Sequence, residues 1–574
     1  MVRKYVKRPA FKAILAIVII GLLATISAAP ASAWTVPPAP TLVNVNPNGN
    51  EGDWLIGAFP PNYSTSKPVI VFVQGLHGSA GNWWGPTMYY GNNDMYAYAY
   101  NNGYRTAFVQ FRDADGTAGS MWLNGSVLKQ QLQLICQYFG VTKVNIVAHS
   151  KGGIDSQSAI VHYGAYPYVQ NVFTLASPHR GSELADLCYS WWSWWLAALL
   201  GQRDDGTYAM QTSYMNYFRS LTDGRTEDAN IRYYLGSGTD WGPWFSAMWY
   251  GGNYLWFTDD SDGVVCHYSA LGLPNGTPVF TLSSANHDNI RMGSKSWSYM
   301  APYLNAYRTT TLSATAVSDS VADAKLPVDA SVSTFVRGGP VEGTARQDFA
   351  VESGNNSLTV SCLVGTTATT GVLIAPDGVR SPLVASLNPS LYGGDAEAAA
   401  EVFRGARAIG VSVANPVAGQ WTLELTAPAP DAYLAVVGFD GGAGIRLARD
   451  TESVYGPGDW IHLRFETSGG NGAALTDLSV DGVVVATSPE RGLAGSTPDY
   501  GLVSRLGLKL VPDSTGVYEA AFKLPGREGL YNLTLDLTGR QADGTVFNRT
   551  LILSKLVLKP EHRNVDGLRA LSEE

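Results

Sequence analysis

The stretch from Lys143 to Gly153 constrains the fold of this chain more than any other. It opens with the residues KVNIVA, which have the apolar pattern of a short buried strand. The turn HSKGG follows directly, and the apolar residues after it, from Ile154 to Val161, indicate a helix. A strand, a sharp turn of small residues and a helix lift the hydroxyl of Ser150 above the end of a sheet. This is the setting that a nucleophile elbow requires.

Other short apolar segments indicate that this strand belongs to a parallel sheet. They alternate with helix-length segments, which is typical of parallel strands joined by right-handed crossovers. The expected strands are residues 69–73, 106–111, 143–148, 172–176, 262–265 and 279–282, with helices at 123–139 and near 299–307. Residues 34–67 are expected to be a coil lead-in. From about Cys188 to Phe257 the alternation stops, and half of the chain's 16 tryptophans fall in this segment.

The first 33 residues have the features of a secretory signal peptide. Five basic residues precede the apolar run 13–26, and Ala31-Ser32-Ala33 fits a cleavage site. We therefore expect a secreted, extracellular protein, with no transmembrane anchor after cleavage because no later segment is long enough to span a membrane. Loss of the five basic residues would take the formal net charge from −9 to −14. This acidic balance argues against nucleic acid as a partner.

Beyond residue 308 the sequence pattern becomes all-β. Short alternating segments, such as Trp421 to Leu425, are separated by turns that contain Gly, Pro, Asp and Asn. We predict three parts after the leader: an α/β domain at 34–308, a β-sandwich module at 309–450, and a second module at 451–574. The second module resembles bacterial immunoglobulin-like modules.

Three stretches of the α/β part resemble those of the α/β-hydrolase lipases and esterases. VQGLHG, after an early strand, is similar to their oxyanion loop; AHSKGG is similar to the elbow of bacterial lipases, including its alanine; SPHRGS is similar to the loop after the following strand. The resemblance covers roughly residues 65–305. It implies an α/β-hydrolase fold with a lid insertion, about residues 188–257, and a catalytic triad in the order Ser, Asp, His.

By this resemblance Ser150 is the nucleophile, Asp262 the acid and His287 the base. A histidine must accept the serine proton during attack, and a carboxylate fixes the tautomer of that histidine. His287 lies in a polar loop just past the last apolar strand. Asp262 precedes Gly-Val-Val, which matches the Asp-Gly-aliphatic-Val stretch of the lipases, and Asp260 is the alternative acid.

The backbone N–H groups of Leu76 and Lys151 are the candidate oxyanion donors. Such donors must form hydrogen bonds with the substrate oxygen on which negative charge develops during attack. Gln74 stands where many lipases have a histidine before the glycine, a departure that leaves both backbone donors in place. We interpret His77 as a loop residue that makes a structural hydrogen bond, with a place in the lining of the pocket as the alternative. We expect structural roles for His149 and His179 as well.

The tryptophan-rich segment is the candidate lid. Residues 191–200 are apolar nearly all round, so they must be buried in protein or meet an apolar partner. The candidate lid and substrate-pocket residues are Trp191, Trp192, Trp194 and Trp195. They would cover an acyl pocket and open against lipid or polymer. Packing into a core is the alternative.

Cysteines and acidic residues complete the site predictions. Cys188 and Cys266 lie on either side of the insertion, and we predict a disulfide between them, which an oxidising compartment would permit. Cys136 and Cys362 lie in apolar stretches and are expected to be buried thiols. No full set of metal ligands is readable, so we expect no metal or other cofactor. Clustered oxygens at 259–262 leave calcium as the alternative.

Taken together, these patterns predict a secreted, monomeric serine hydrolase of carboxylic esters. The favoured activity is that of a lipase that acts on acylglycerols through an acyl-enzyme at Ser150, with a lipid or polymeric ester as its partner. One alternative is a depolymerase of aliphatic polyesters whose β-modules hold the polymer. A different class is a surface-binding protein with an inactive hydrolase domain, against which the intact Ser, Asp and His argue.

Overall fold

The computed structural model describes most of the chain after the leader. The described ranges are 34–44, 51–193, 195, 203–305, 329–385, 406–448, 454–468, 475–487, 502–512 and 517–573. The predicted signal peptide, residues 1–33, lies outside them. None of the helices in these ranges has both the length and the apolar composition that crossing a membrane requires.

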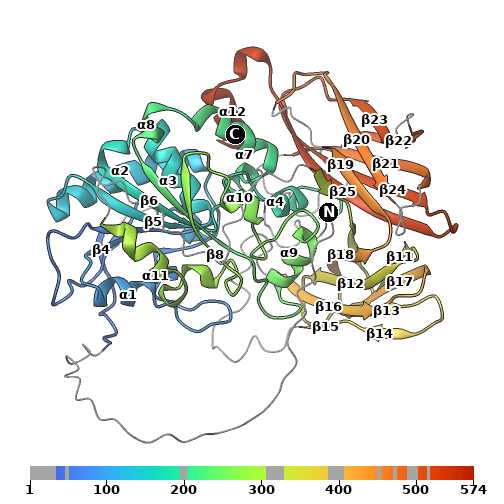
Figure 1. Cartoon of the computed structure of the whole chain (residues 1–574), viewed down its shortest axis with the longest axis horizontal. Helices are drawn as coiled ribbons and strands as arrows, with labels where there is room; N and C mark the ends of the chain where they lie inside the picture. Colours follow the sequence, from blue (N-terminus) through green and yellow to red (C-terminus); the bar gives the residue numbers. More distant parts are fainter. Residues whose placement is uncertain are drawn as a thin grey trace, which may run out of the picture. The chain divides into compact units, whose positions relative to one another are not determined.

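An eight-stranded sheet forms the centre of the N-terminal half (Figure 1). Its order is β1-β2-β4-β3-β5-β6-β7-β8; the pairs β1–β2 and β2–β4 are antiparallel and the other neighbours are parallel. The strands are β1 (Thr41–Asn44), β2 (Trp54–Ile56), β3 (Ile70–Val73), β4 (Thr106–Val109), β5 (Val144–His149), β6 (Val169–Leu175), β7 (Arg232–Gly238) and β8 (Gly276–Leu282). This sheet confirms the predicted α/β-hydrolase fold.

Helices cover both faces of this sheet. Successive residues of β3 point to opposite faces: Val71 packs in the core on the α2 and α3 side, and Phe72 in the core on the α1 and α11 side. A strand that is covered on both faces is apolar throughout, which is why the sequence shows it as a continuous apolar run. The four helices are α1 (Met95–Asn101), α2 (Met121–Phe139), α3 (Lys151–His162) and α11 (Gly293–Leu304).

The structure corrects three details of the predicted sheet. β1 and β2 lie within the supposed coil lead-in, and β7 lies within the supposed lid at 188–257. Residues 262–265 form a turn and not a strand. β7 escaped notice because its apolar content is confined to Tyr233, Tyr234 and Leu235 among Arg, Gly and Ser, yet all three side chains are buried.

The insertion therefore consists of two pieces on either side of β7. The first, between β6 and β7, contains α4 (Glu183–Cys188), α6 (Asp205–Ala209), α7 (Thr212–Thr222) and α8 (Thr226–Ala229). The second, between β7 and β8, contains α9 (Ala247–Leu255) and α10 (His267–Ala270). We call these two pieces together the insertion.

Two pairs of antiparallel sheets form the C-terminal half, and each pair encloses its own apolar core. The first pair has the orders β10-β18-β12-β16-β15 and β11-β17-β13-β14. Its strands are β10 (Thr334–Val341), β11 (Thr344–Val351), β12 (Asn355–Val364), β13 (Thr370–Ile374), β14 (Arg380–Pro382), β15 (Val384–Ala385), β16 (Arg407–Ala414), β17 (Gly419–Thr426) and β18 (Asp431–Gly441).

The second pair has the orders β23-β20-β19-β9 and β22-β21-β24-β25. Its strands are β9 (Asp329–Ser331), β19 (Gly444–Ala448), β20 (Trp460–Ser468), β21 (Thr476–Thr487), β22 (Leu502–Lys509), β23 (Val517–Lys523), β24 (Gly529–Arg540) and β25 (Val546–Val557). A final helix, α12 (Val565–Glu573), follows.

The two modules are not divided at residue 450 as predicted. β9 precedes the first module in the chain but pairs with β19 in the second, through partners such as Ala330 and Leu447. The chain thus contributes one strand to the second module, builds the first module from residues 334–441, and then returns. Strand pairing over such a separation leaves no local mark in the sequence.

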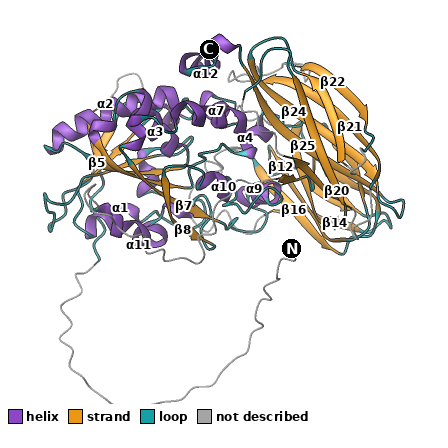
Figure 2. Ribbon diagram, turned by 45° about the horizontal axis from the view of Figure 1, so that its top comes forward, coloured by secondary structure: helices purple, strands orange, loops and turns teal. Residues whose placement is uncertain are grey.

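The C-terminal modules pack directly on the insertion. Leu434, Leu530 and Leu556 share one apolar core with residues of α4, α6 and α7, such as Tyr208 and Tyr214. Figures 1 and 2 show α4 and α9 next to the C-terminal strands, in agreement with contacts of α4 with β25 and of α9 with β12 and β18. Pro37 to Glu574 accordingly form one compact unit.

A buried ion pair joins the two modules. Glu352, between β11 and β12, lies 2.5 Å from Nη2 of Arg549 in β25, and both side chains are fully buried. The Arg549 guanidinium also lies over the ring of Phe439, 3.8 Å from its centroid. Removing one partner of such a pair leaves an uncompensated charge in the interior.

We predict that Glu352→Gln lowers the free energy of unfolding by about 3–5 kcal/mol, the usual cost of breaking a buried pair. Urea denaturation of the intact chain measures the loss. The control is Glu424→Gln, which weakens the pairs of Glu424 with two solvent-exposed arginines, Arg346 and Arg380, and should move the unfolding midpoint far less. Equal effects of the two substitutions would contradict the prediction.

Candidate active site

Ser150 occupies a strained turn between β5 and α3. Its backbone has φ 52° and ψ −133°, and its N–H donates to the carbonyl of Leu175 at the end of β6, 2.9 Å away. A positive φ is uncommon for a residue with a side chain and marks a position that the surrounding structure fixes. A Cβ atom at Gly152 would lie 2.3 Å from the carbonyl oxygen of Gln74. Only glycine permits this close approach of α3 to the loop after β3.

Asp262 and His287 form a buried hydrogen-bonded pair. Asp262 Oδ2 lies 2.7 Å from His287 Nδ1, and the His287 backbone N–H donates to the carbonyl of Asp262. Asp262 Oδ1 accepts hydrogen bonds from the N–H groups of Val264 and Val265 at 3.0 and 2.8 Å. This turn needs Gly263, which has φ +93° and lies against the carbonyl of Met248. The Asp-Gly-Val-Val stretch is therefore a carboxylate-holding turn.

Two further histidines have structural positions, as the sequence suggested. His149 Nε2 donates to the carbonyl of His287, 2.7 Å away, so it holds the backbone of that residue. His179 is fully buried and its Nε2 lies 3.2 Å from Thr174 Oγ1. Burial, assisted by Arg219 and Arg180, lowers the pKa of His179 well below its ordinary value. Its burial and its contact with Thr174 give His179 the structural position that was expected.

The loop after β3 holds its shape through its own hydrogen bonds. The Gln74 side-chain amide donates to the carbonyl of Gly78 at 3.0 Å, so this residue supports the loop where many lipases have a histidine. Leu76 is buried in this loop, and Lys151 is buried at the start of α3. The loop and the helix therefore meet beside the turn of Ser150.

A cluster of buried charges lies behind the elbow. Nζ of Lys151 is 2.9 and 3.0 Å from the two carboxylate oxygens of Asp155 and 3.6 Å from Asp113. Burial alone lowers the pKa of Lys151, but the two carboxylates outweigh burial and the pKa is raised. Burial raises the pKa of Asp155 to about 7 against the opposing effect of Lys151. The ammonium therefore stays charged inside the protein.

Asp259 and Asp262, two of the aspartates that suggested calcium, have protein partners, as has Asp288, which follows His287. Asp288 accepts a hydrogen bond from the N–H of Met88 and pairs with the guanidinium of Arg291. Asp259 accepts a hydrogen bond from the N–H of Tyr268. Within the described ranges, no three His, Cys, Asp or Glu side chains converge as a metal site requires.

The candidate lid tryptophans contact the C-terminal modules. The N–H of Trp191 donates to Thr534 Oγ1 in β24 at 3.1 Å. The Arg337 guanidinium of β10 lies 4.5 Å from the ring centroid of Trp192. Trp195 packs against the core that the insertion shares with the modules. Trp194 lies outside the described residues. Trp191 and Trp192 are thus partly buried against the C-terminal modules, and their role as a lid stays a prediction.

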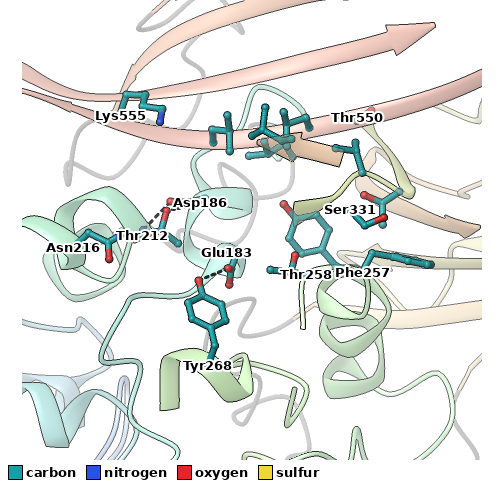
Figure 3. A pocket seen from close by; sticks show the side chains of 17 residues that line it. Glu183, Asp186, Thr212, Asn216, Phe257, Thr258, Tyr268, Ser331, Thr550 and Lys555 are labelled. Atoms are coloured by element: carbon teal, nitrogen blue, oxygen red, sulfur yellow. Dashed lines mark hydrogen bonds between the residues drawn. The ribbon is translucent and has the colours of Figure 1, made fainter. Parts of the chain in front are cut away.

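A cavity of about 210 Å³ lies between the insertion and β25 (Figure 3). Its polar lining includes Glu183 and Asp186, which already accept hydrogen bonds from Tyr268 and Thr212. Ser150 is not among the lining residues, so this cavity is separate from the elbow. We assign no acyl chain to it.

The disulfide predicted between Cys188 and Cys266 is wrong, because both residues are free, buried thiols. Cys188 ends α4, whereas Cys266 precedes α10 and hydrogen bonds to the carboxylate of Glu183. Burial raises the pKa of Cys188 to about 12 and that of Cys266 well above its ordinary value. The prediction rested on the positions of Cys188 and Cys266 at the two ends of the predicted lid, which do not determine whether their sulfur atoms lie within bonding distance.

Part of the chain matches known families by sequence. Residues 64–188 match the family model of the PGAP1-like alpha/beta domain. A triacylglycerol lipase of Pseudarthrobacter phenanthrenivorans is 29% identical over 130 residues, which are 22% of this chain. The aligned part spans 37% of the length of that relative.

A solved structure matches nearly the whole chain. The lipase BlEst2 of Bacillus licheniformis, in its propeptide form, is 28% identical with a TM-score of 0.68, over 89% of this chain and 99% of that one. The mature form of the same lipase is 41% identical with a TM-score of 0.41, over 45% of this chain and 99% of that one. Because the first match covers 89% of the chain, it includes C-terminal strands as well as the central sheet.

We predict that alkylation with iodoacetamide at neutral pH modifies Cys188 and Cys266 only after denaturation. Their burial and raised pKa values keep the thiols protonated and inaccessible in the folded chain. Peptide mapping by mass spectrometry without a reducing agent reads out the result. A disulfide-linked peptide that contains Cys188 and Cys266 would show that the bond exists and would contradict the prediction.

Proposed function

We propose that this chain, which belongs to the bacterial α/β-hydrolase lipases and esterases, hydrolyses carboxylic esters with Ser150 as the nucleophile. One observation carries the proposal: the buried pair of Asp262 and His287, joined at 2.7 Å, belongs to the same fold as the strained Ser150 turn. These are the three groups that acyl transfer needs, in the chain order expected for this fold.

Each residue has a defined role in the proposed reaction. Ser150 Oγ attacks the ester carbonyl while His287 Nε2 accepts its proton, and Asp262 stabilises the resulting imidazolium. The N–H groups of Leu76 and Lys151 donate to the oxyanion of the tetrahedral intermediate. The imidazolium then returns the proton to the leaving alcohol. Water, activated by the same histidine, hydrolyses the acyl-enzyme.

We propose acylglycerols as the substrate class and an exported enzyme as the setting. The triacylglycerol lipase similarity and the apolar insertion support the first, and the leader at residues 1–33 supports the second. The alternative of a polyester depolymerase assigns the β-modules to polymer binding. The alternative of an inactive, surface-binding protein predicts no hydrolysis at all.

A substrate panel tests these assignments. We expect turnover of p-nitrophenyl butyrate and of emulsified tributyrin, with a rate on tributyrin that rises as the substrate passes its solubility limit, and no release from a poly(3-hydroxybutyrate) film. Faster release from the film than from tributyrin would favour the depolymerase. Absence of turnover on all three would favour the binding protein.

The choice of acid has its own test. We predict that Asp262→Asn lowers kcat by about 10³–10⁴-fold, because the histidine loses the carboxylate that fixes its tautomer. The matched control is Asp260→Asn, since Asp260 is exposed and only its backbone carbonyl accepts a hydrogen bond, from the N–H of His267. Assay with p-nitrophenyl butyrate measures both. A larger loss at Asp260 would reverse the choice.

We further propose that the C-terminal modules are the counterpart of the propeptide named for the Bacillus lipase and hold the insertion closed. Ser150 is 3% exposed and His287 fully buried, so a segment next to the site must move before an ester can enter, and we propose that the insertion is that segment. The modules contact it by specific bonds: the Asn532 amide donates to the carbonyl of Asp186 at 2.8 Å, and Thr534 accepts from Trp191. Weakening these contacts should favour the open state.

We predict that the double variant Asn532→Ala, Thr534→Val turns over p-nitrophenyl butyrate at least several-fold faster than the unmodified chain. Two hydrogen bonds of about 1 kcal/mol each would shift a closed–open equilibrium by roughly tenfold or more. Thr538→Val is the control, because Thr538 lies on the same strand but bonds to Asn548 and not to the insertion. A double variant as slow as the unmodified chain would contradict the proposal.

A further inference from the structure

His77, in the loop after β3, is held by a residue of the insertion. Its Nε2 lies 2.5 Å from Oδ2 of Asp204, and both side chains are nearly buried. The backbone of His77 has φ 52°, a left-handed conformation that is uncommon for a residue with a side chain. His77 directly follows Leu76, one of the two proposed oxyanion donors. The conformation of this donor loop is therefore tied to Asp204.

Asp204 is itself fixed by two backbone N–H groups. Its Oδ1 accepts the N–H of Thr207 at 2.8 Å and so caps α6, and its Oδ2 accepts the N–H of Ala118 at 3.0 Å. Burial alone would raise the pKa of Asp204, but the pairing with His77 and these hydrogen bonds leave it lowered. Asp204 is thus a carboxylate at neutral pH, and it joins the insertion to two loops of the central fold.

The loop that contains Ala118 leads to the second proposed donor. Residue Gly119, next to Ala118, donates its N–H to Asp113 Oδ2 at 3.3 Å. Asp113 is one of the two carboxylates around the buried Lys151 ammonium. Residues 113–119 therefore connect Asp204, which holds the Leu76 loop, with Lys151, whose N–H is the other donor.

α6 also touches the donor loop by packing. A Cβ atom at Gly206 would lie 2.9 Å from Leu76 Cδ1 and 2.9 Å from the carbonyl oxygen of Gly119. No room remains between α6, the Leu76 side chain and residues 118–119. A displacement of α6 would therefore shift the loop that contains Leu76.

We propose that Asp204 is a positioning residue for ester hydrolysis. By holding His77, it orients the backbone N–H of Leu76 so that this N–H and the N–H of Lys151 point at the same oxyanion. The oxyanion hole is then complete only while the first turn of α6 is in place. This inference rests on the proposed function, since it concerns the donors of the same site. Asp204 touches no reacting atom and acts through the loop.

The test compares two neighbouring aspartates. Asp204→Asn keeps an oxygen that can cap α6, because asparagine caps as well as aspartate. It places an amide nitrogen where Oδ2 faces His77 and the N–H of Ala118, so both of these contacts are lost. We expect kcat on p-nitrophenyl butyrate to fall by about 10–100-fold, below the 10²–10³-fold loss of a whole oxyanion donor, with KM changed less than about twofold. Asp205→Asn, which weakens a longer, partly exposed contact with Arg112 and leaves His77 paired with Asp204, should retain kcat within about twofold.

A double-mutant cycle separates positioning from a general loss of structure. We expect His77→Gln to lower kcat as Asp204→Asn does, and the double variant to lose no more than the worse single variant, because both remove one interaction. Circular dichroism and thermal unfolding identify any variant that fails to fold, in which case His77→Gln alone decides. Unchanged kcat in a folded Asp204→Asn, losses that multiply, or a rise in KM with unchanged kcat would overturn the inference.

The Ser150→Ala variant, assayed in the same experiment, distinguishes failure of the proposed function from failure of the proposed role of Asp204. If Ser150→Ala retains turnover, the proposed function fails, whatever Asp204 does. If Ser150→Ala is inactive while Asp204→Asn is as fast as the unmodified chain, the function stands and only the positioning role of Asp204 is refuted.

Discussion

The candidate site depends on the close approach of the first turn of α3 to the loop after β3. At Gly152 the two backbones are so near that a Cβ would lie 2.3 Å from the Gln74 carbonyl oxygen. β5 pairs in parallel with β3 on one side and with β6 on the other. This pairing fixes the position at the end of the sheet where the chain leaves β5 and begins α3. Ser150 keeps its positive φ because the strands and the helix leave it no other conformation.

Buried charges link distant segments to this turn. Lys151 binds Asp113 and Asp155 beneath the elbow, His77 binds Asp204 of the insertion, and Glu352 binds Arg549 between the modules. A buried pair adds little net stability compared with apolar packing, but the loss of one partner is expensive. Such pairs therefore fix how segments are placed. Together with the shared apolar core, they make the insertion depend on both the central sheet and the C-terminal modules.

Local patterns in the sequence predicted the parts of the site that are built locally. The strand before Ser150 is short, continuous and apolar, and it has the expected geometry. The stretch Asp262-Gly-Val-Val is predicted as a strand but forms a turn, in which Asp262 pairs with His287. The predictions that failed concern contacts between residues far apart in the chain. β9 pairs with β19, which lies more than a hundred residues later, and Cys188 and Cys266 form no disulfide. The apolar composition of residues 191–200 predicted packing against protein or another apolar partner, but it could not reveal that β24 and β10 contact Trp191 and Trp192. The pairing of His77 with Asp204 was likewise invisible, because a capping aspartate carries no sign of a distant second partner.

Labelling of the intact chain with a fluorophosphonate probe tests the role of Ser150 most directly. The probe reacts with a serine that a neighbouring histidine activates. We predict a single adduct, mapped by peptide mass spectrometry to Ser150, and no adduct in a Ser150→Ala variant whose circular dichroism is unchanged. An adduct on another serine, or labelling that persists in the folded alanine variant, would contradict the assignment of Ser150 as the nucleophile.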